Sequence, residues 1–187
     1  MKELAQFRTL CCSNSSITIG ILSFWLVTTS CSQNPENRPS PLRVDSVQIG
    51  STTLRVEYSS PSVRGRKIFG IGDTYLEQYG KIWRTGANEA TTFSTDRDLK
   101  IDTFDLPKGK YAIFTIPDSN SWEVIFNKEW NQWGTYYHKD SLDVVRLRVT
   151  PTKLDSLQEQ MKLSVSPSAL NFRWDNITWS IPISLSE

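Results

Sequence analysis

The strongest constraint on the fold is an alternation of apolar and polar residues with a period of two, repeated in many short segments. Successive side chains of a β-strand point to opposite faces, so this alternation predicts strands with one buried face. Leu54, Val56 and Tyr58, for example, alternate with Arg55 and Glu57. The same pattern recurs in five further segments: 122–127, 145–149, 161–165, 170–174 and 177–183.

Residues 111–116 (YAIFTI) are apolar on both faces, which predicts a central strand. Short helices are expected only at 74–80 and 152–160. Many short strands joined by turns are typical of one antiparallel β-sandwich, jelly-roll-like or related, and we expect this all-β fold. Segments rich in turn-forming residues separate the predicted strands: 49–51, 107–110, 117–121 and 167–168.

The N-terminus is typical of a targeting segment. Residues 17–27 form an apolar run that is too short to cross a bilayer as a helix but long enough for a signal-peptide core. Small residues then lead into Cys31, which resembles the lipobox of bacterial lipoproteins, although Thr28 stands where leucine is usual. We therefore expect a lipoprotein signal peptide at 1–30 with lipidation at Cys31. The alternative is an ordinary cleaved signal or an uncleaved anchor, with Cys31 incidental.

The segment after the cysteine predicts a flexible tether. Residues 31–41 contain three prolines and are almost without apolar side chains, so they have little surface to bury. We expect the β-sandwich to span 42–187 and a lipid anchor to hold it at the bacterial cell envelope, on the periplasmic face or at the outer membrane.

Composition excludes several function classes. The 21 basic residues balance 20 acidic residues, and a net charge of +1 lacks the positive field that non-specific nucleic-acid binding needs. The only histidine is His138, and the cysteines all lie in the first 31 residues. A zinc cluster, a multi-histidine metal site and a cysteine nucleophile are therefore excluded from 42–187. We expect no metal and no cofactor.

Residues 79–94 hold the most unusual polar cluster. Their side chains include a guanidinium, an amide and a carboxylate, which suit a hydroxyl-rich or anionic ligand. Downstream, Trp130 and Trp133 stand beside amides; we expect one of them in the core and the other against a ligand. Trp122, Trp174 and Trp179 are expected in the core. The predicted ligand-binding residues are Trp83, Arg84, Thr85, Asn88, Glu89 and Trp133.

Simpler explanations exist for the same residues. Arg84 and Glu89 are also suited to pair with each other and stabilise a buried loop. The basic segment 64–67 is expected to be a solvated turn. A Ser–His–Asp assembly at 138–141 is not expected, because triads depend on geometry in space and not on nearness in sequence.

Four segments match a known family in their order and spacing. The resemblance extends from about residue 44 to residue 184. The chain resembles the bacterial domain of unknown function 2911 family, which is typical of Bacteroidetes and whose members commonly carry a secretion or lipoprotein signal. The resemblance implies no reaction, because the family has no assigned activity. Residues 71–78 are an addition to the simpler family pattern. The segments are SSPSVRGRKIFG, YGKIWRTGANEATTFS, LPKGKYAIFTIP and WEVIFNKEWNQWGTY.

Three functions remain open. The first, which the sequence favours over an enzyme, is a lipoprotein. It would bind a glycan, a peptide or an envelope protein through the 83–89 loop and nearby aromatic residues. The second is a hydrolase with Glu89 as acid or base, which would usually need a second carboxylate at a set distance; Asp73, Glu77 and Glu123 are the candidates. The third is a structural envelope protein without a ligand site.

Overall fold

The computed structural model describes residue 34 and residues 37–186 of the chain. The predicted signal peptide at 1–30 and the predicted lipidation site at Cys31 lie outside these residues. Within the described part, no helix is long and apolar enough to span a membrane.

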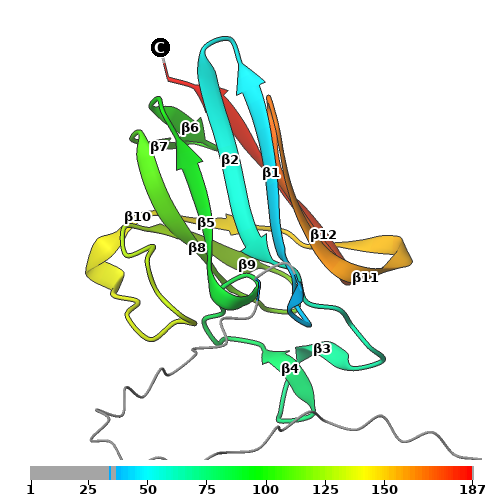
Figure 1. Ribbon diagram of the computed structural model, residues 1–187. Coiled ribbons are helices and arrows are strands. Elements are labelled where there is room, and N and C mark those ends of the chain that lie inside the picture. The colour runs from blue at the N-terminus through cyan, green and yellow to red at the C-terminus, as the bar shows by residue number, and fades with distance from the viewer. Residues whose placement is uncertain (1–33, 35–36, 187) are drawn as a thin grey trace, which may run out of the picture. The chain divides into compact units, whose positions relative to one another are not determined.

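A six-stranded antiparallel sheet carries the candidate site (Figure 1). Its edges are β1 and β10, and the predicted central strand 111–116 lies inside β8, between β5 and β9, which confirms that prediction. In order across the sheet, the strands are β1 (Leu42–Ile49), β2 (Thr52–Ser59), β5 (Ala87–Thr95), β8 (Gly109–Ile116), β9 (Trp122–Asn127) and β10 (Asp143–Val149).

A second, four-stranded antiparallel sheet packs against the first. Its strands, in order, are β11 (Thr152–Ser166), β12 (Ala169–Leu185), β6 (Leu99–Ile101) and β7 (Phe104–Leu106). The short parallel pair β3 (Lys67–Gly70) and β4 (Tyr75–Gln78) lies at one end of the two sheets, and β6 and β7 lie at the other (Figure 1). A 3-10 turn, η2 (Asp140–Leu142), precedes β10.

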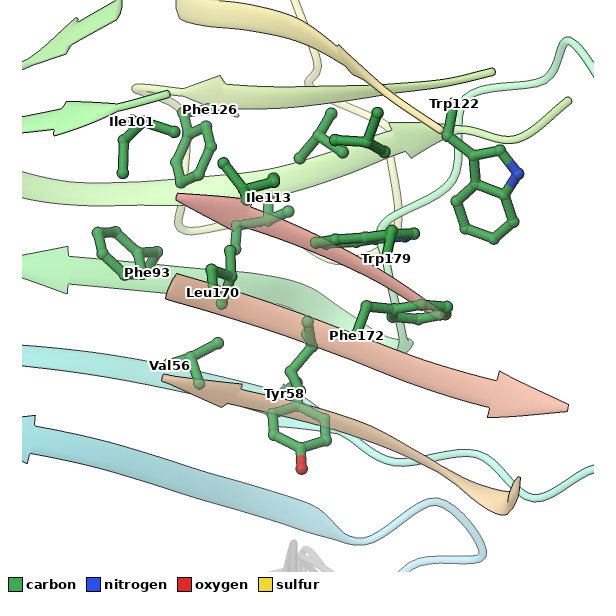
Figure 2. Close-up of a cluster of buried hydrophobic side chains, with 14 of the residues drawn as sticks. Val56, Tyr58, Phe93, Ile101, Ile113, Trp122, Phe126, Leu170, Phe172 and Trp179 are labelled. Atoms are coloured by element: carbon green, nitrogen blue, oxygen red, sulfur yellow. The ribbon is translucent and has the colours of Figure 1, made fainter. Parts of the chain in front are cut away.

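The core lies between the two sheets and is rich in aromatic rings (Figure 2). Phe172 stacks on Trp179 with ring centroids 5.0 Å apart, and Trp83 stacks on Trp174 at 5.6 Å. Such ring pairs add to the stability that the burial of apolar area already provides. Trp122, Trp174 and Trp179 are all buried, as predicted.

The antiparallel β-sandwich is confirmed, but the two expected helices are wrong. Residues 75–78 form strand β4, and 152–160 belong to β11, which pairs with β12. Leu154 and Leu157 have the spacing of a helical face, yet Leu157 is exposed and covers nothing. The long hairpin supplies backbone hydrogen-bond partners to this segment, and this tertiary pairing overrides its weak helical pattern.

A smaller apolar cluster lies on the outer face of the six-stranded sheet. It consists of Ala90, Ala112, Phe114 and Ile125. The segment 128–142 between β9 and β10 passes over this face, and the His138 ring packs edge-on against Phe114 at 4.9 Å. The outer face is therefore partly covered, and the candidate site lies at the margin of this cover.

Candidate functional site

A pocket of about 500 Å³ lies on the outer face of the six-stranded sheet. Its floor comes from outward side chains of β2, β5 and β8, and its wall comes from the 128–142 segment. This size falls in the range of small-molecule sites. The lining residues are Leu42, Glu57, Tyr58, Ser59, Glu89, Ala90, Thr92, Lys110, Trp130, Asn131, Gln132, Trp133 and Tyr137.

Strand register explains why polar side chains form the floor. Glu57 pairs with Thr92 across β2 and β5, so both side chains point to the same face of the sheet. Their neighbours Val56 and Phe93 are also paired and point into the core. The period of two that buries one face therefore presents Glu57 and Thr92 on the other.

Aromatic side chains dominate the wall of the pocket. Trp130, Trp133 and Tyr137 are 39%, 51% and 63% exposed, so the pocket is open to solvent. We expected one of Trp130 and Trp133 in the core, and this is wrong: both are partly exposed, because the 128–142 segment lies over the sheet and not inside the sandwich. Exposed aromatic rings grouped on one segment are unusual on a protein surface and are typical of interaction sites.

Hydrogen bonds tie the wall to the edge of β5. The backbone N–H of Ala90 donates to the carbonyl of Gln132 (3.0 Å), and that of Gly134 donates to the carbonyl of Asn88 (3.1 Å). Glu89 and Trp133 face each other in an antiparallel bridge. The fold thus brings together two of the residues predicted from sequence, Glu89 and Trp133.

Asn127 anchors the start and the end of the wall segment. Its amide nitrogen donates to the carbonyl of Lys139 (3.0 Å) and to the Asp143 carboxylate (2.6 Å). Its amide oxygen accepts from the backbone N–H of Glu129 (2.8 Å). Asn127 is fully buried, so these bonds form in a dry environment where a lost partner is costly.

A charged network lies on the floor beside the aromatic wall. Glu57 accepts hydrogen bonds from Arg55 and from Lys110, whose Nζ is 3.0 Å from Oε2. Lys110 also lies over the Trp130 ring, 4.6 Å from its centroid, as a cation–π contact. Burial raises the pKa of Glu57, but the hydrogen bonds and charges of Arg55 and Lys110 outweigh it and hold the pKa below its ordinary value. Glu57 is therefore ionised at neutral pH.

The second carboxylate of the pocket, Glu89, pairs with Arg38. Arg38 Nη1 donates to both carboxylate oxygens, at 2.7 and 2.9 Å, and the Glu89 side chain is 47% exposed. Asn88 donates to the carbonyl of Ser40 (3.2 Å), and the Ser60 N–H donates to that of Pro41 (2.9 Å). The last residues of the predicted tether, 38–41, thus contact the sandwich beside the pocket.

The other predicted site residues do not line the pocket. Trp83 is buried in the core and its indole N–H donates to the carbonyl of Gly86 (2.9 Å). Thr85 is fully buried in a left-handed conformation (φ 51°), and its hydroxyl contacts that of Thr115. A β-branched residue rarely adopts this conformation, so the surrounding structure must hold the backbone of Thr85 in this turn. Asn88 lies next to the pocket and orients residues 38–41.

Arg84 does not pair with Glu89. Its Nε is buried and has no hydrogen-bond partner among the described residues. The charges of Arg84 and Arg66 act instead on the carboxyl group of Glu77. Burial raises the pKa of the Glu77 carboxyl to about 8, although Arg84 and Arg66 act to lower it.

The raised pKa of Glu77 predicts that the protein loses stability as the pH rises. Between pH 4.5 and about 8, the unfolded chain ionises at Glu77 while the folded chain keeps its proton. The unfolding free energy should therefore fall through this window, by on the order of 1 kcal/mol for a partly exposed group. Glu77→Gln should remove this loss, with stability near wild type at pH 4 and higher at pH 9 in thermal melts. Parallel pH curves for both proteins would contradict it.

Four further residues contribute to the site and were not predicted from the sequence: Glu57, Lys110, Tyr137 and Arg38. In the sequence, Glu57 is a polar position of a predicted strand and Lys110 ends a predicted turn, and nothing local separates them from other charged residues. The three candidates for a second carboxylate, Asp73, Glu77 and Glu123, do not line the pocket.

The remaining polar clusters have structural partners. His138 lies within 3.1 Å of the Asp143 carboxylate and 3.7 Å of that of Asp140, close enough for a shared cation. The Arg146 guanidinium already donates to both carboxylates, at 3.2 Å from Asp140 and 2.8 Å from Asp143, and balances part of their charge. In the basic turn, Arg66 donates to backbone carbonyls of Ser62 and Val63.

One comparison with known proteins gives a match. Residues 40–183 match the model of a family described as "protein of unknown function (DUF2911)", which confirms the resemblance inferred from the four sequence segments. The match covers the strands and the 128–142 segment that form the pocket. No curated protein and no solved structure matches the chain.

Proposed function

We propose that this chain, which belongs to the DUF2911 family of proteins of unknown function, is a lipoprotein of the bacterial cell envelope that binds a glycan in the pocket beside Glu89 and Trp133. The apolar run 17–27 and the small residues before Cys31 support the envelope location. The observation that carries the binding function is the group of exposed aromatic rings over a floor of charged side chains.

A glycan suits both surfaces of the pocket. The C–H face of a sugar ring packs on an indole, and Trp130 and Trp133 offer two of them. Sugar hydroxyls both donate and accept hydrogen bonds. Each oxygen of the Glu89 carboxylate accepts one hydrogen bond from Arg38 and can accept another from a sugar hydroxyl. Glu57 and Glu89 form ion pairs with Lys110 and Arg38, so their charges are balanced. The pocket therefore favours an uncharged sugar over an ionic ligand.

Binding fits the pocket better than hydrolysis. Two carboxylates do line it, and this observation favours the second candidate, a glycoside hydrolase. Such an enzyme needs one carboxyl that keeps its proton near neutral pH. The pKa of Glu57 is lowered by Arg55 and Lys110, which makes this residue unsuitable as the proton donor.

The test is a screen of the full-length protein against neutral oligosaccharides from cellulose, xylan and chitin, with short peptides as the comparison. At a hundred times its dissociation constant, a ligand should stabilise the protein by about 2.7 kcal/mol, which thermal melts detect. Calorimetry then measures the affinity. A response to peptides alone, or to no oligosaccharide, would overturn the glycan proposal. Release of reducing ends would favour the hydrolase.

Glu89→Gln separates a binding role from a structural one. The Arg38–Glu89 pair is half-exposed, so its loss should cost less than about 1 kcal/mol of stability, while the affinity for the oligosaccharide falls. Glu123→Gln is the matched control: this glutamate is paired with Arg146 on the same sheet but lies outside the pocket. A loss of several kcal/mol in Glu89→Gln with unchanged affinity would instead indicate the structural role.

A further inference from the structure

We propose a second binding site, for a phosphate-class oxyanion, on the four-stranded sheet at Lys162 and Arg173. The site is separate from the aromatic pocket and does not depend on the proposed glycan function. Three observations support this proposal. Two like charges lie opposite each other, a polar hollow contains both of them, and no carboxylate among the described residues lines that hollow.

Lys162 and Arg173 lie directly opposite each other on β11 and β12. Like charges at opposed positions of an antiparallel pair destabilise the sheet. Neither side chain has an ion-pair partner within 4.0 Å among residues 34 and 37–186. A bound anion would offset the repulsion.

The two cations lie in a polar hollow of about 450 Å³. Hydroxyl and amide groups of Ser164, Asn171 and Thr178 line the same hollow. A second hollow of about 250 Å³ shares Gln158 and Lys162 with the first and adds Arg43 from β1. Among the described residues that line either hollow, three are cations and none carries a carboxylate.

This set of donors fits phosphate. The guanidinium of Arg173 offers two parallel N–H groups to two oxygens of one phosphate, and Lys162 adds a compact charge. The Ser164 hydroxyl and the Asn171 amide can donate to the remaining oxygens, whereas the Thr178 hydroxyl already donates to the carbonyl of Phe172 (2.7 Å). The nearby Glu159 carboxylate is engaged by the backbone N–H of Arg64 (2.8 Å) and does not line the first hollow.

Calorimetric titration of the full-length protein with pyrophosphate and with glucose 6-phosphate tests the site. Lys162→Gln and Arg173→Gln should each weaken binding about tenfold, the low end for loss of a charged hydrogen-bond donor. Lys153→Gln, which removes an exposed charge from the same strand outside both hollows, should leave the affinity unchanged. Equal weakening in all three variants, or no binding of either probe or of vesicles, would overturn the proposal.

A second readout distinguishes a binding site from a structural cluster. Without phosphate, Lys162→Gln and Arg173→Gln should raise the melting temperature slightly, because each relieves the repulsion between opposed cations. A clear fall would show that the cations serve the fold and would contradict the proposal. Vesicles of phosphatidylcholine with and without phosphatidylglycerol identify the source of the phosphate. If the protein binds only the anionic vesicles and Arg173→Gln abolishes this binding, the ligand is a lipid headgroup. If the protein binds glucose 6-phosphate, the ligand is a soluble phosphorylated molecule.

Discussion

Replacing Trp133 with alanine should weaken oligosaccharide binding about 30-fold, which corresponds to about 2 kcal/mol for the loss of a central tryptophan anchor. The Trp133 indole is half-exposed and lines the pocket, so a ligand can bury it. The contact of Trp133 with Glu89 across the bridge belongs to the backbone and survives the substitution. The unfolding free energy should therefore change little, and calorimetry with the oligosaccharide found in the screen measures the effect.

Tyr136→Ala is the control for this prediction. Tyr136 lies in the same segment and is 80% exposed, but it does not line the pocket. Its removal should leave the affinity unchanged. If both variants lose affinity equally, the segment contributes through its general apolar character, and the pocket is not the site.

The architecture was largely predictable because its main signal is local. The alternation along β2 or β12 occurs within a few residues, and it reports burial directly. The two wrong helices, at 74–80 and 152–160, lie where the apolar pattern is sparse and the conformation depends on a partner strand. No local signal in the sequence identifies that partner.

The site was only half predictable, for a different reason. Glu57, Thr92 and Lys110 come together because β2, β5 and β8 are neighbours in the sheet, although Glu57 and Lys110 are 53 residues apart in the chain. The motif at 83–89 is unusual in the sequence, but its residues separate in space. Trp83 and Thr85 turn into the sandwich, and Glu89 alone of the predicted polar residues lines the pocket.

Asn127→Ala should have the largest effect on the protein as a whole. The substitution removes the amide that binds both ends of the 128–142 segment and leaves the Glu129 N–H and the Lys139 carbonyl without their partner. Unpaired buried polar groups of this kind cost about 1–3 kcal/mol each, so we expect a loss of about 3 kcal/mol in denaturant unfolding. Oligosaccharide binding should also be lost, because Trp130 and Trp133 are carried by the segment that Asn127 holds in place.

Thr115→Val separates the loss of the wall from general destabilisation. Thr115 is fully buried on the neighbouring strand β8, and its hydroxyl accepts a hydrogen bond from that of Thr85 (3.3 Å) on the face of the sheet away from the wall. This variant should be less stable than the wild type but should bind the oligosaccharide normally. If Asn127→Ala kept its affinity, the aromatic wall would be held by its contacts with β5 alone. In that case the bonds at Ala90 and Gly134, and not those of Asn127, would define the pocket.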